Sequence, residues 1–316
     1  MTKGKKALLT TIPLALVLIV VSFYYLMPGV AFKVLEKIER SNAGFKQHSI
    51  KVNASNIEYL KGGKGDNLLL LHGFGGDKDN WTRIGRCLTP HFCVIAPDLP
   101  GFGESTRDPN ADYTIAAQTD RVHAFIQSLK LNSFHLAGCS MGGHIAGTYA
   151  ARYPKNVISL WLIAPGGVAS SDPSEWTRLL KAGKPDPLIV DSVEGYDQLL
   201  DFIFVKRPFI PRPIKQYFAQ QAIKYHLFNE KIDEQLRKAE DSSPSLEVLL
   251  AQSSIPTLIL WGAEDRVLHV SGARILESVM PKAKAVIMEG IGHAPMIERP
   301  EESAKYFLRF LDITDR

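Results

Sequence analysis

Short apolar runs recur along the chain and alternate with longer stretches in which apolar residues stand three or four positions apart. The short runs are continuous, which is typical of parallel strands covered on both faces. We expect buried strands at residues 67–72, 92–97, 134–139, 158–164, 256–261 and 284–288. The stretch 115–129 has the spacing of an amphipathic helix. The alternation predicts an α/β fold with a doubly wound, mostly parallel sheet.

Two segments interrupt this alternation. Residues 48–52 and 57–60, separated by the polar stretch 53–56, predict an antiparallel hairpin at the sheet edge. From about 168 to 254 the chain is helix-forming and punctuated by prolines, as expected of an inserted helical cap. The predicted core is therefore 33–167 and 255–316, with the cap at 168–254. One core with an insertion suits a chain of 316 residues.

Within the predicted cap, residues 199–217 combine aromatic and aliphatic side chains with basic ones. One interpretation is an apolar face packed on the core with a solvated basic face. The other is an acyl-chain tunnel or a membrane-docking surface. The apolar members are Phe202, Ile203, Phe204, Val205, Phe209, Ile210 and Tyr217, and the basic members are Lys206, Arg207, Arg212 and Lys215.

The N-terminus carries lysines ahead of an uncharged apolar run over residues 7–27. About 20 apolar residues span a bilayer as a helix, so residues 1–32 predict a signal anchor. A cleaved signal peptide, with small residues Gly29 and Ala31 near the cleavage point, is the main alternative, and a buried N-terminal helix is the third. We expect a membrane-anchored protein whose folded part lies outside the cytoplasm, in the periplasm, or a secreted one if the N-terminus is cleaved.

Composition narrows the class of protein. Apolar residues make up 45% and charged residues 22%, as in ordinary globular proteins. The net charge of +4 is too mild and too scattered to indicate nucleic-acid binding. The three cysteines, Cys87, Cys93 and Cys139, form neither a disulfide framework nor a metal-ligand pattern, and we expect free, buried thiols. The sequence specifies no oligomeric state.

The strongest chemical signal surrounds Ser140. It lies in the run Gly-Cys-Ser-Met-Gly-Gly at 138–143, which follows a predicted strand and opens a helix-like stretch. This is the context of a nucleophile elbow, whose tight turn needs nearly side-chain-free neighbours such as Gly138 and Gly142. A chance match of the pattern in a flexible loop is the alternative. Ser140 is the predicted nucleophile.

A serine nucleophile needs a histidine base and an acid that orients the histidine. Asp265 follows the predicted strand 256–261, and His293 lies in a glycine-flanked loop after the last strand. The chain order Ser, Asp, His is that of α/β-hydrolases. His269 is the rival base, and Glu264 is the rival acid.

The oxyanion of the tetrahedral intermediate needs backbone N–H groups aimed at it. We expect one from Met141, directly after the nucleophile, and one from Phe74 in the glycine-rich loop after the strand 67–72. That loop lacks the lysine and serine pattern of a nucleotide-binding loop.

Together these motifs resemble the α/β-hydrolase superfamily from about residue 49 to the C-terminus. They are Leu-His-Gly-Phe-Gly-Gly at 71–76, Asp-Leu-Pro-Gly-Phe-Gly at 98–103, the elbow at 138–143, Trp261-Gly262 with Asp265, and Gly292-His293. With the apolar N-terminus, the run Lys-Asp-Asn-Trp at 78–81 and the run from Gly292 to Pro300, the chain resembles membrane-tethered monoacylglycerol lipases and related bacterial lipases. The elbow departs slightly, since Cys139 stands where such enzymes often carry Asn or Thr.

The resemblance implies a serine esterase that hydrolyses acylglycerols, either monoacylglycerol or triacylglycerol, through an acyl-enzyme and without a metal or organic cofactor. Phospholipase A-type activity is an alternative, as is hydrolysis of a carbon–carbon bond in dienone acids by enzymes with a similar elbow and cap. Dehalogenases and epoxide hydrolases use an aspartate where this chain has Ser140. A non-catalytic binding module is the remaining alternative, and it conflicts with the filled triad positions.

Overall fold

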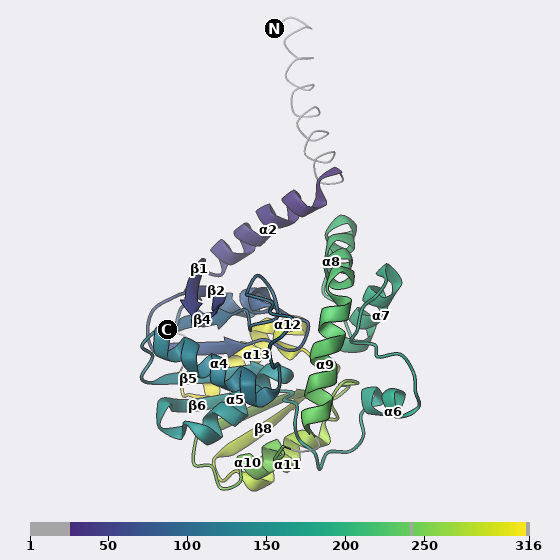
Figure 1. Cartoon of the computed structure of the whole chain (residues 1–316). Helices are drawn as coiled ribbons and strands as arrows, with labels where there is room; N and C mark the ends of the chain where they lie inside the picture. Colours follow the sequence, from purple (N-terminus) through teal and green to yellow (C-terminus); the bar gives the residue numbers. More distant parts are fainter. Residues whose placement is uncertain (1–25, 241–242, 314–316) are drawn as a thin grey trace, which may run out of the picture.

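The computed structural model describes residues 26–240 and 243–313, and its centre is a single twisted sheet (Figure 1). The strand order is β1-β2-β4-β3-β5-β6-β7-β8. The strands are β1 (Phe45–Val52), β2 (Ser55–Gly62), β3 (Asn67–Leu71), β4 (Cys93–Pro97), β5 (Phe134–Cys139), β6 (Val157–Ile163), β7 (Thr257–Gly262) and β8 (Ala283–Met288). From β4 through β8 neighbouring strands are parallel, whereas β1 pairs with β2 and β2 with β4 in antiparallel fashion. The predicted α/β fold with a mostly parallel sheet is confirmed.

The leading hairpin is longer than the sequence predicts. Its strands run to Val52 and from Ser55, so that only Asn53 and Ala54 connect them, in place of the expected stretch 53–56. The apolar pattern underestimates β1 because this strand is at the sheet edge and most of its side chains are exposed or half-buried. The other strand boundaries differ from the prediction by at most one residue.

Helices cover both faces of the sheet, because successive side chains of a strand point to opposite faces. Leu69 and Leu71 of β3 enter the apolar cluster beneath α4 and α5, while Leu68 and Leu70 enter the one beneath α3 and α13. The helices of the two layers are α3 (Thr82–Leu88), α4 (Ile115–Ser128), α5 (Met141–Arg152), α11 (Ser271–Val279), α12 (Pro295–Glu298) and α13 (Pro300–Phe310), with short 3-10 turns η1 (Lys78–Trp81) and η2 (Pro154–Asn156).

In the described residues between β6 and β7 the chain forms five helices, of which the first four extend to one side of the sheet (Figure 1), while the fifth packs against α5 and α11. They are α6 (Glu175–Lys181), α7 (Val193–Ile203), α8 (Arg212–Lys224), α9 (His226–Glu240) and α10 (Leu246–Leu249). This insertion contacts the loops that follow β7 and β8. The Trp176 N–H donates to Arg266 O at 2.9 Å, and the His293 N–H donates to Ile203 O at 2.8 Å.

The first helix of the described residues is α2 (Pro28–Asn42), which packs against α8. The ring of Phe32 lies 5.1 Å from that of Tyr217 and 4.9 Å from that of Phe218. The predicted signal anchor falls almost wholly on residues 1–25, outside the described residues. From Leu26 onward, where the chain is described, no helix is long and apolar enough to cross a membrane.

The cysteines differ in burial. Cys139 at the end of β5 is buried as predicted, but Cys87 and Cys93 are only partly buried. The expectation that all three thiols are buried is therefore wrong for these two. Cys87 lies on the amphipathic helix α3, and Cys93 is the first residue of β4, where the strand enters the core.

Candidate active site

Ser140 occupies the sharp turn between β5 and α5. Its φ and ψ are 57° and −122°, in a region that non-glycine residues rarely adopt and that costs about 1–3 kcal/mol. The turn leaves no room for side chains at its flanks. A Cβ on Gly138 would lie 2.1 Å from Gly142 O, and one on Gly142 would lie 2.3 Å from Leu71 O. The strained turn presents the half-buried serine at the carboxyl end of β5.

Asp265 and His293 are brought together at the ends of β7 and β8. The distance from His293 Nδ1 to Asp265 Oδ2 is 2.8 Å, and the aspartate side chain is fully buried. Asp265 Oδ1 also accepts the N–H groups of Val267 and Leu268 at 2.8 and 3.0 Å. An ionised carboxylate in this position assigns the proton to Nδ1 and leaves Nε2 of His293 free to accept another.

The serine and the aspartate–histidine pair lie on one edge of the sheet. β5, β6, β7 and β8 are adjacent and parallel, so Ser140, Asp265 and His293 all follow carboxyl ends of strands. Within residues 26–240 and 243–313 no hydrogen bond joins Ser140 to His293. Catalytic hydrogen bonds commonly tighten only when substrate binds.

The loop after β3 lies beside the elbow, since Leu71 pairs with Gly138. A Cβ on Gly73 would stand 3.1 Å from Ser140 Cβ, so the loop backbone passes directly over the serine. Met141, the other expected oxyanion donor, is the first residue of α5, where backbone N–H groups have no partner within the helix.

His72 sets the direction of one peptide in this loop. The Leu99 N–H donates to His72 Nε2 at 2.9 Å, so the proton resides on Nδ1, which donates to Gly73 O at 2.8 Å. Burial lowers the pKa of His72, which keeps the ring neutral for both roles. The carbonyl of Gly73 and the N–H of Phe74 belong to one planar trans peptide and point in opposite directions. Fixing the carbonyl therefore fixes the Phe74 N–H.

Two further side chains hold the Asp265 and His293 loops, and neither is among the site residues that the sequence predicts. The Trp261 indole N–H donates to Asp265 Oδ2 at 3.0 Å. Glu298 accepts the Gly292 N–H at 3.0 Å and the Lys206 N–H at 2.7 Å. Neither Trp261 and Asp265 nor Gly292 and Glu298 lie within one helix or strand, so no periodic pattern of side chains connects them.

The rival acid and base have other partners. Glu264 accepts the Ile291 N–H at 2.9 Å, and His269 Nδ1 lies 2.9 Å from Ser271 Oγ.

His144 lies one turn after Ser140 on α5, against the backbone of Gly167. Burial lowers its pKa to about 4, so its ring is neutral near pH 7.

Part of the segment 199–217 packs on the core, as the first interpretation expects, and part of it is exposed, as a membrane-docking surface would be. Phe202 is buried and Ile203 packs against the apolar cluster on the α3 and α13 face, whereas Phe209 is 85% exposed.

A cavity of about 520 Å³ beside Arg266 and Phe204 is lined by both charged and apolar side chains. Among the residues described, no group of three histidine, cysteine or acidic side chains is arranged to hold a metal ion.

Comparisons with known proteins agree with this architecture. A model of the alpha/beta hydrolase fold family matches residues 66–188. Lipase 1 of Psychrobacter immobilis is 37% identical over 283 residues, which cover 88% of this chain and 87% of the relative. Monoacylglycerol lipase ABHD6 of Mus musculus is 36% identical over 252 residues, which cover 77% of this chain and 75% of the relative.

A solved structure is similar over nearly the whole length. It is described as a membrane phospholipase A and bacterial virulence factor. It superimposes with a TM-score of 0.88 at 42% identity and covers 98% of each chain.

Proposed function

The chain belongs to the α/β-hydrolase family, and from that premise we propose that it is a serine hydrolase of lipid esters. The observation that carries the proposal is the strained backbone of Ser140 at the end of β5, together with the hydrogen-bonded pair His293 and Asp265 at the same edge of the sheet. Relatives named as lipases support an ester of a lipid as substrate.

In the proposed acylation, His293 Nε2 takes the proton of Ser140 Oγ as this oxygen attacks the ester carbonyl carbon. The carbonyl oxygen becomes an oxyanion, which accepts hydrogen bonds from the N–H groups of Phe74 and Met141. Each such donor contributes about 3 kcal/mol to stabilising the transition state. Asp265 stabilises the imidazolium. The ester C–O bond then breaks, and His293 gives its proton to the departing alcohol.

Deacylation repeats the sequence with water. His293 takes a proton from water as the water oxygen attacks the acyl carbon, and the oxyanion again accepts hydrogen bonds from the N–H groups of Phe74 and Met141. Ser140 leaves and recovers its proton from His293, and the fatty acid is released. One water molecule is consumed, and the triad returns to its starting protonation state.

Two lipid classes are supported by particular observations. The lipase and monoacylglycerol lipase relatives favour acylglycerols, which are the proposed substrates. The similarity to a structure described as a membrane phospholipase A favours phospholipids as the second candidate, because that match is higher in identity and covers more of the chain.

We further propose that the insertion 168–254 serves as a cap and that the N-terminal part holds the enzyme at a membrane with the catalytic part outside the cytoplasm. Support comes from the apolar run 7–27 and from α2, on which Val30, Val34 and Ile38 form an exposed apolar stripe. These residues recur every four positions, so their side chains lie along one face of the helix. Phe209 of the insertion is exposed as well.

The experiment is hydrolysis of monoacylglycerol, triacylglycerol, phospholipid and dienone acid by the purified full chain, with Ser140→Ala alongside. We expect fatty-acid release from acylglycerols that Ser140→Ala abolishes. Release from phospholipid alone makes the protein a phospholipase A. Cleavage of dienone acid alone, or no turnover of any substrate, refutes the proposal.

A further inference from the structure

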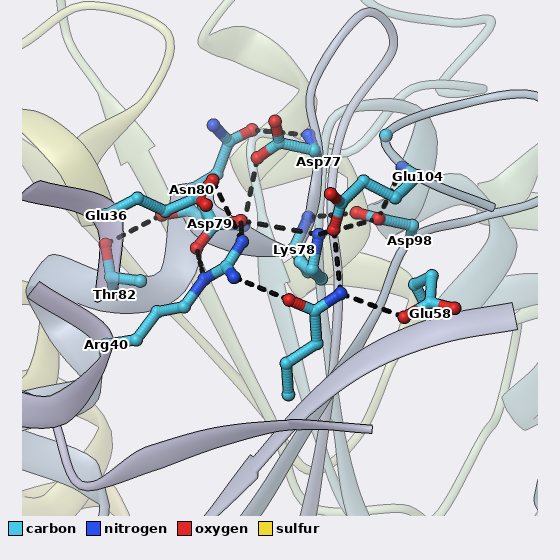
Figure 2. Close-up of polar contacts among 12 residues, drawn as sticks. Glu36, Arg40, Glu58, Asp77, Lys78, Asp79, Asn80, Thr82, Asp98 and Glu104 are labelled. Atoms are coloured by element: carbon cyan, nitrogen blue, oxygen red, sulfur yellow. Dashed lines mark hydrogen bonds and ion pairs between the residues drawn. The ribbon is translucent and has the colours of Figure 1, made fainter. Parts of the chain in front are cut away.

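A network of charged side chains, the innermost of them buried, joins α2 to the 3-10 turn after the loop that carries Phe74 (Figure 2). Arg40, in the last turn of α2, is only 6% exposed. Its Nε and Nη2 donate to the two carboxylate oxygens of Asp79 at 2.6 and 2.5 Å. Its Nη1 donates to Gln47 of β1 at 2.7 Å. Paired bonds between a guanidinium and a carboxylate fix orientation as well as distance.

Asp79 belongs to η1, the 3-10 turn that starts directly after the glycine-rich loop. The preceding residue, Lys78, is 2% exposed, and its Nζ lies 2.9 Å from both Asp98 and Glu104. The Lys78 N–H also donates to Asp98 Oδ1 at 2.7 Å. Successive residues of η1 are thus bound from two directions, Lys78 by the loop after β4 and Asp79 by α2 (Figure 2).

Two contacts of the loop bear on Phe74, since the Gly76 N–H donates to Gly73 O at 3.1 Å and the Phe74 ring packs beside that of Phe102. Gly73, Gly75 and Gly76 surround Phe74, and Gly75 adopts a φ of +68°. Glycine backbones have wide conformational freedom, so the position of such a loop depends also on what holds its two ends. Strand β3 and His72 hold the first end, and η1 holds the second.

The network is better suited to fixing geometry than to adding stability. Removing charges from water costs free energy that largely offsets their attraction, so buried ion pairs contribute little net stability. A displacement of about 1 Å at a catalytic group, by contrast, lowers rates about a hundredfold.

We propose that Arg40 of α2 is a positioning residue for ester hydrolysis, acting through Asp79 and η1 to hold the Phe74 N–H in the oxyanion hole. This inference rests on the proposed function and extends the catalytic support to a helix outside the sheet core. The N-terminal helix α2 is then required for turnover of soluble esters as well as for any contact with lipid.

The test uses the full chain and the short soluble ester p-nitrophenyl butyrate, so that membrane binding does not enter the measurement. Arg40→Met is expected to lower kcat by about 10- to 100-fold with KM within about twofold. Arg40→Lys keeps the charge but loses the paired bonds, and should be intermediate. Lys37→Met removes the same charge from an exposed position of α2 and should equal wild type.

A trifluoromethyl ketone tests the oxyanion hole directly. Ser140 Oγ adds to its carbonyl carbon, the proton passes to His293, and the resulting oxyanion needs the same N–H groups as the transition state. The inhibition constant of this compound should rise in Arg40→Met by the factor by which kcat/KM falls. Inhibition by the product, butyrate, should stay unchanged.

Asp79→Asn provides a second variant in case Arg40→Met fails to fold. It should reproduce the kcat loss, and the double variant should lose no more than either single one, because the two residues act as one unit. Folded variants with wild-type kcat and wild-type ketone inhibition overturn the inference, even if they unfold more easily. Failure of the proposed function is a separate result, in which wild type has no esterase activity or Ser140→Ala retains it.

Discussion

At the scale of single residues, the candidate site depends on polar groups whose donors and acceptors are paired with one another. Asp265 accepts from His293, from the Trp261 indole and from two backbone N–H groups. A carboxylate with four donors has little freedom to rotate, so the imidazole beside it is fixed in orientation. His72 acts similarly on the Gly73–Phe74 peptide. Preorganised groups of this kind avoid reorganisation during the reaction.

The Trp261 indole provides the first prediction. Trp261→Phe removes one donor from Asp265 and should lower kcat about tenfold with KM unchanged, because hydrogen bonds to charged groups are worth about 1.5–3 kcal/mol. Steady-state hydrolysis of p-nitrophenyl butyrate checks it. Trp161→Phe is the matched control, since the buried Trp161 indole N–H has no hydrogen-bond partner among the residues that the structure describes and the ring stacks on Phe307. Equal kcat in the two variants would contradict the prediction.

Asp77 provides a prediction on pH and stability. Burial, followed by the charges of Asp79 and Asp98, raises the pKa of Asp77 from 3.8 to about 7. The folded protein therefore retains a proton that the unfolded chain loses near pH 4, and the free energy of unfolding falls as pH rises from about 4 to 7.

Asp77→Asn removes this dependence while its amide oxygen can still accept the Asp79 N–H that caps η1. The variant should be more stable than wild type by about 1–2 kcal/mol at pH 8 and no more stable at pH 4. Urea unfolding at both values measures the difference. The exposed Asp191→Asn is the control. A variant that is less stable than wild type at pH 8 would refute this account of Asp77.

At the scale of elements, the sequence predicts what the backbone pattern determines. Continuous apolar runs mark the inner strands, and the positions after their carboxyl ends identify Ser140, Asp265 and His293 as candidates. Edge strand β1 is underestimated because its polar side chains face solvent. The contact of Arg40 with Asp79 has no sequence signal, since these residues are 39 positions apart and meet only through tertiary packing.

Glu298 connects two elements and supports a further prediction. It accepts the N–H groups of Gly292, beside His293, and of Lys206, three residues after the end of α7. Glu298→Ala leaves both without this partner and should lower stability by about 1–3 kcal/mol and kcat as well. Thermal unfolding and esterase assays test this. Glu289→Ala, at an exposed position of the loop that carries His293, should match wild type. Wild-type stability and kcat in Glu298→Ala as well would contradict the prediction.

The exposed stripe of α2 leads to a prediction on membranes. Val34 and Ile38 are 48% and 49% exposed, and burying them in a bilayer surface is favourable. In a chain that begins at Leu26, so that the apolar run 7–27 cannot hold it on the bilayer, Val34→Glu with Ile38→Glu should reduce co-flotation with vesicles of neutral phosphatidylcholine severalfold.

The matched control is Val248→Glu, an exposed valine on α10, which lies at the opposite end of the molecule from α2 (Figure 1). Made in the same shortened chain, this variant should float as the unsubstituted one does. Undiminished flotation of the α2 variant would show that the stripe does not contact lipid.

At the scale of the whole molecule, parts distant in sequence support one edge of the sheet. Strand ends carry the candidate triad, the insertion between β6 and β7 binds the loops of Asp265 and His293, and α2 binds η1 beside the loop of Phe74. Motif context identifies the candidate reacting groups. The groups that hold them are set by long-range packing, which a single sequence does not display.

The central claim is that Ser140 is the nucleophile, and active-site labelling tests it most directly. A fluorophosphonate transfers its phosphonyl group to an activated serine with loss of fluoride, and mass spectrometry locates the adduct. Wild type should carry a single adduct on the peptide containing Ser140, and both Ser140→Ala and His293→Ala should carry none. An adduct on another residue, or an unchanged adduct in His293→Ala, would contradict the account.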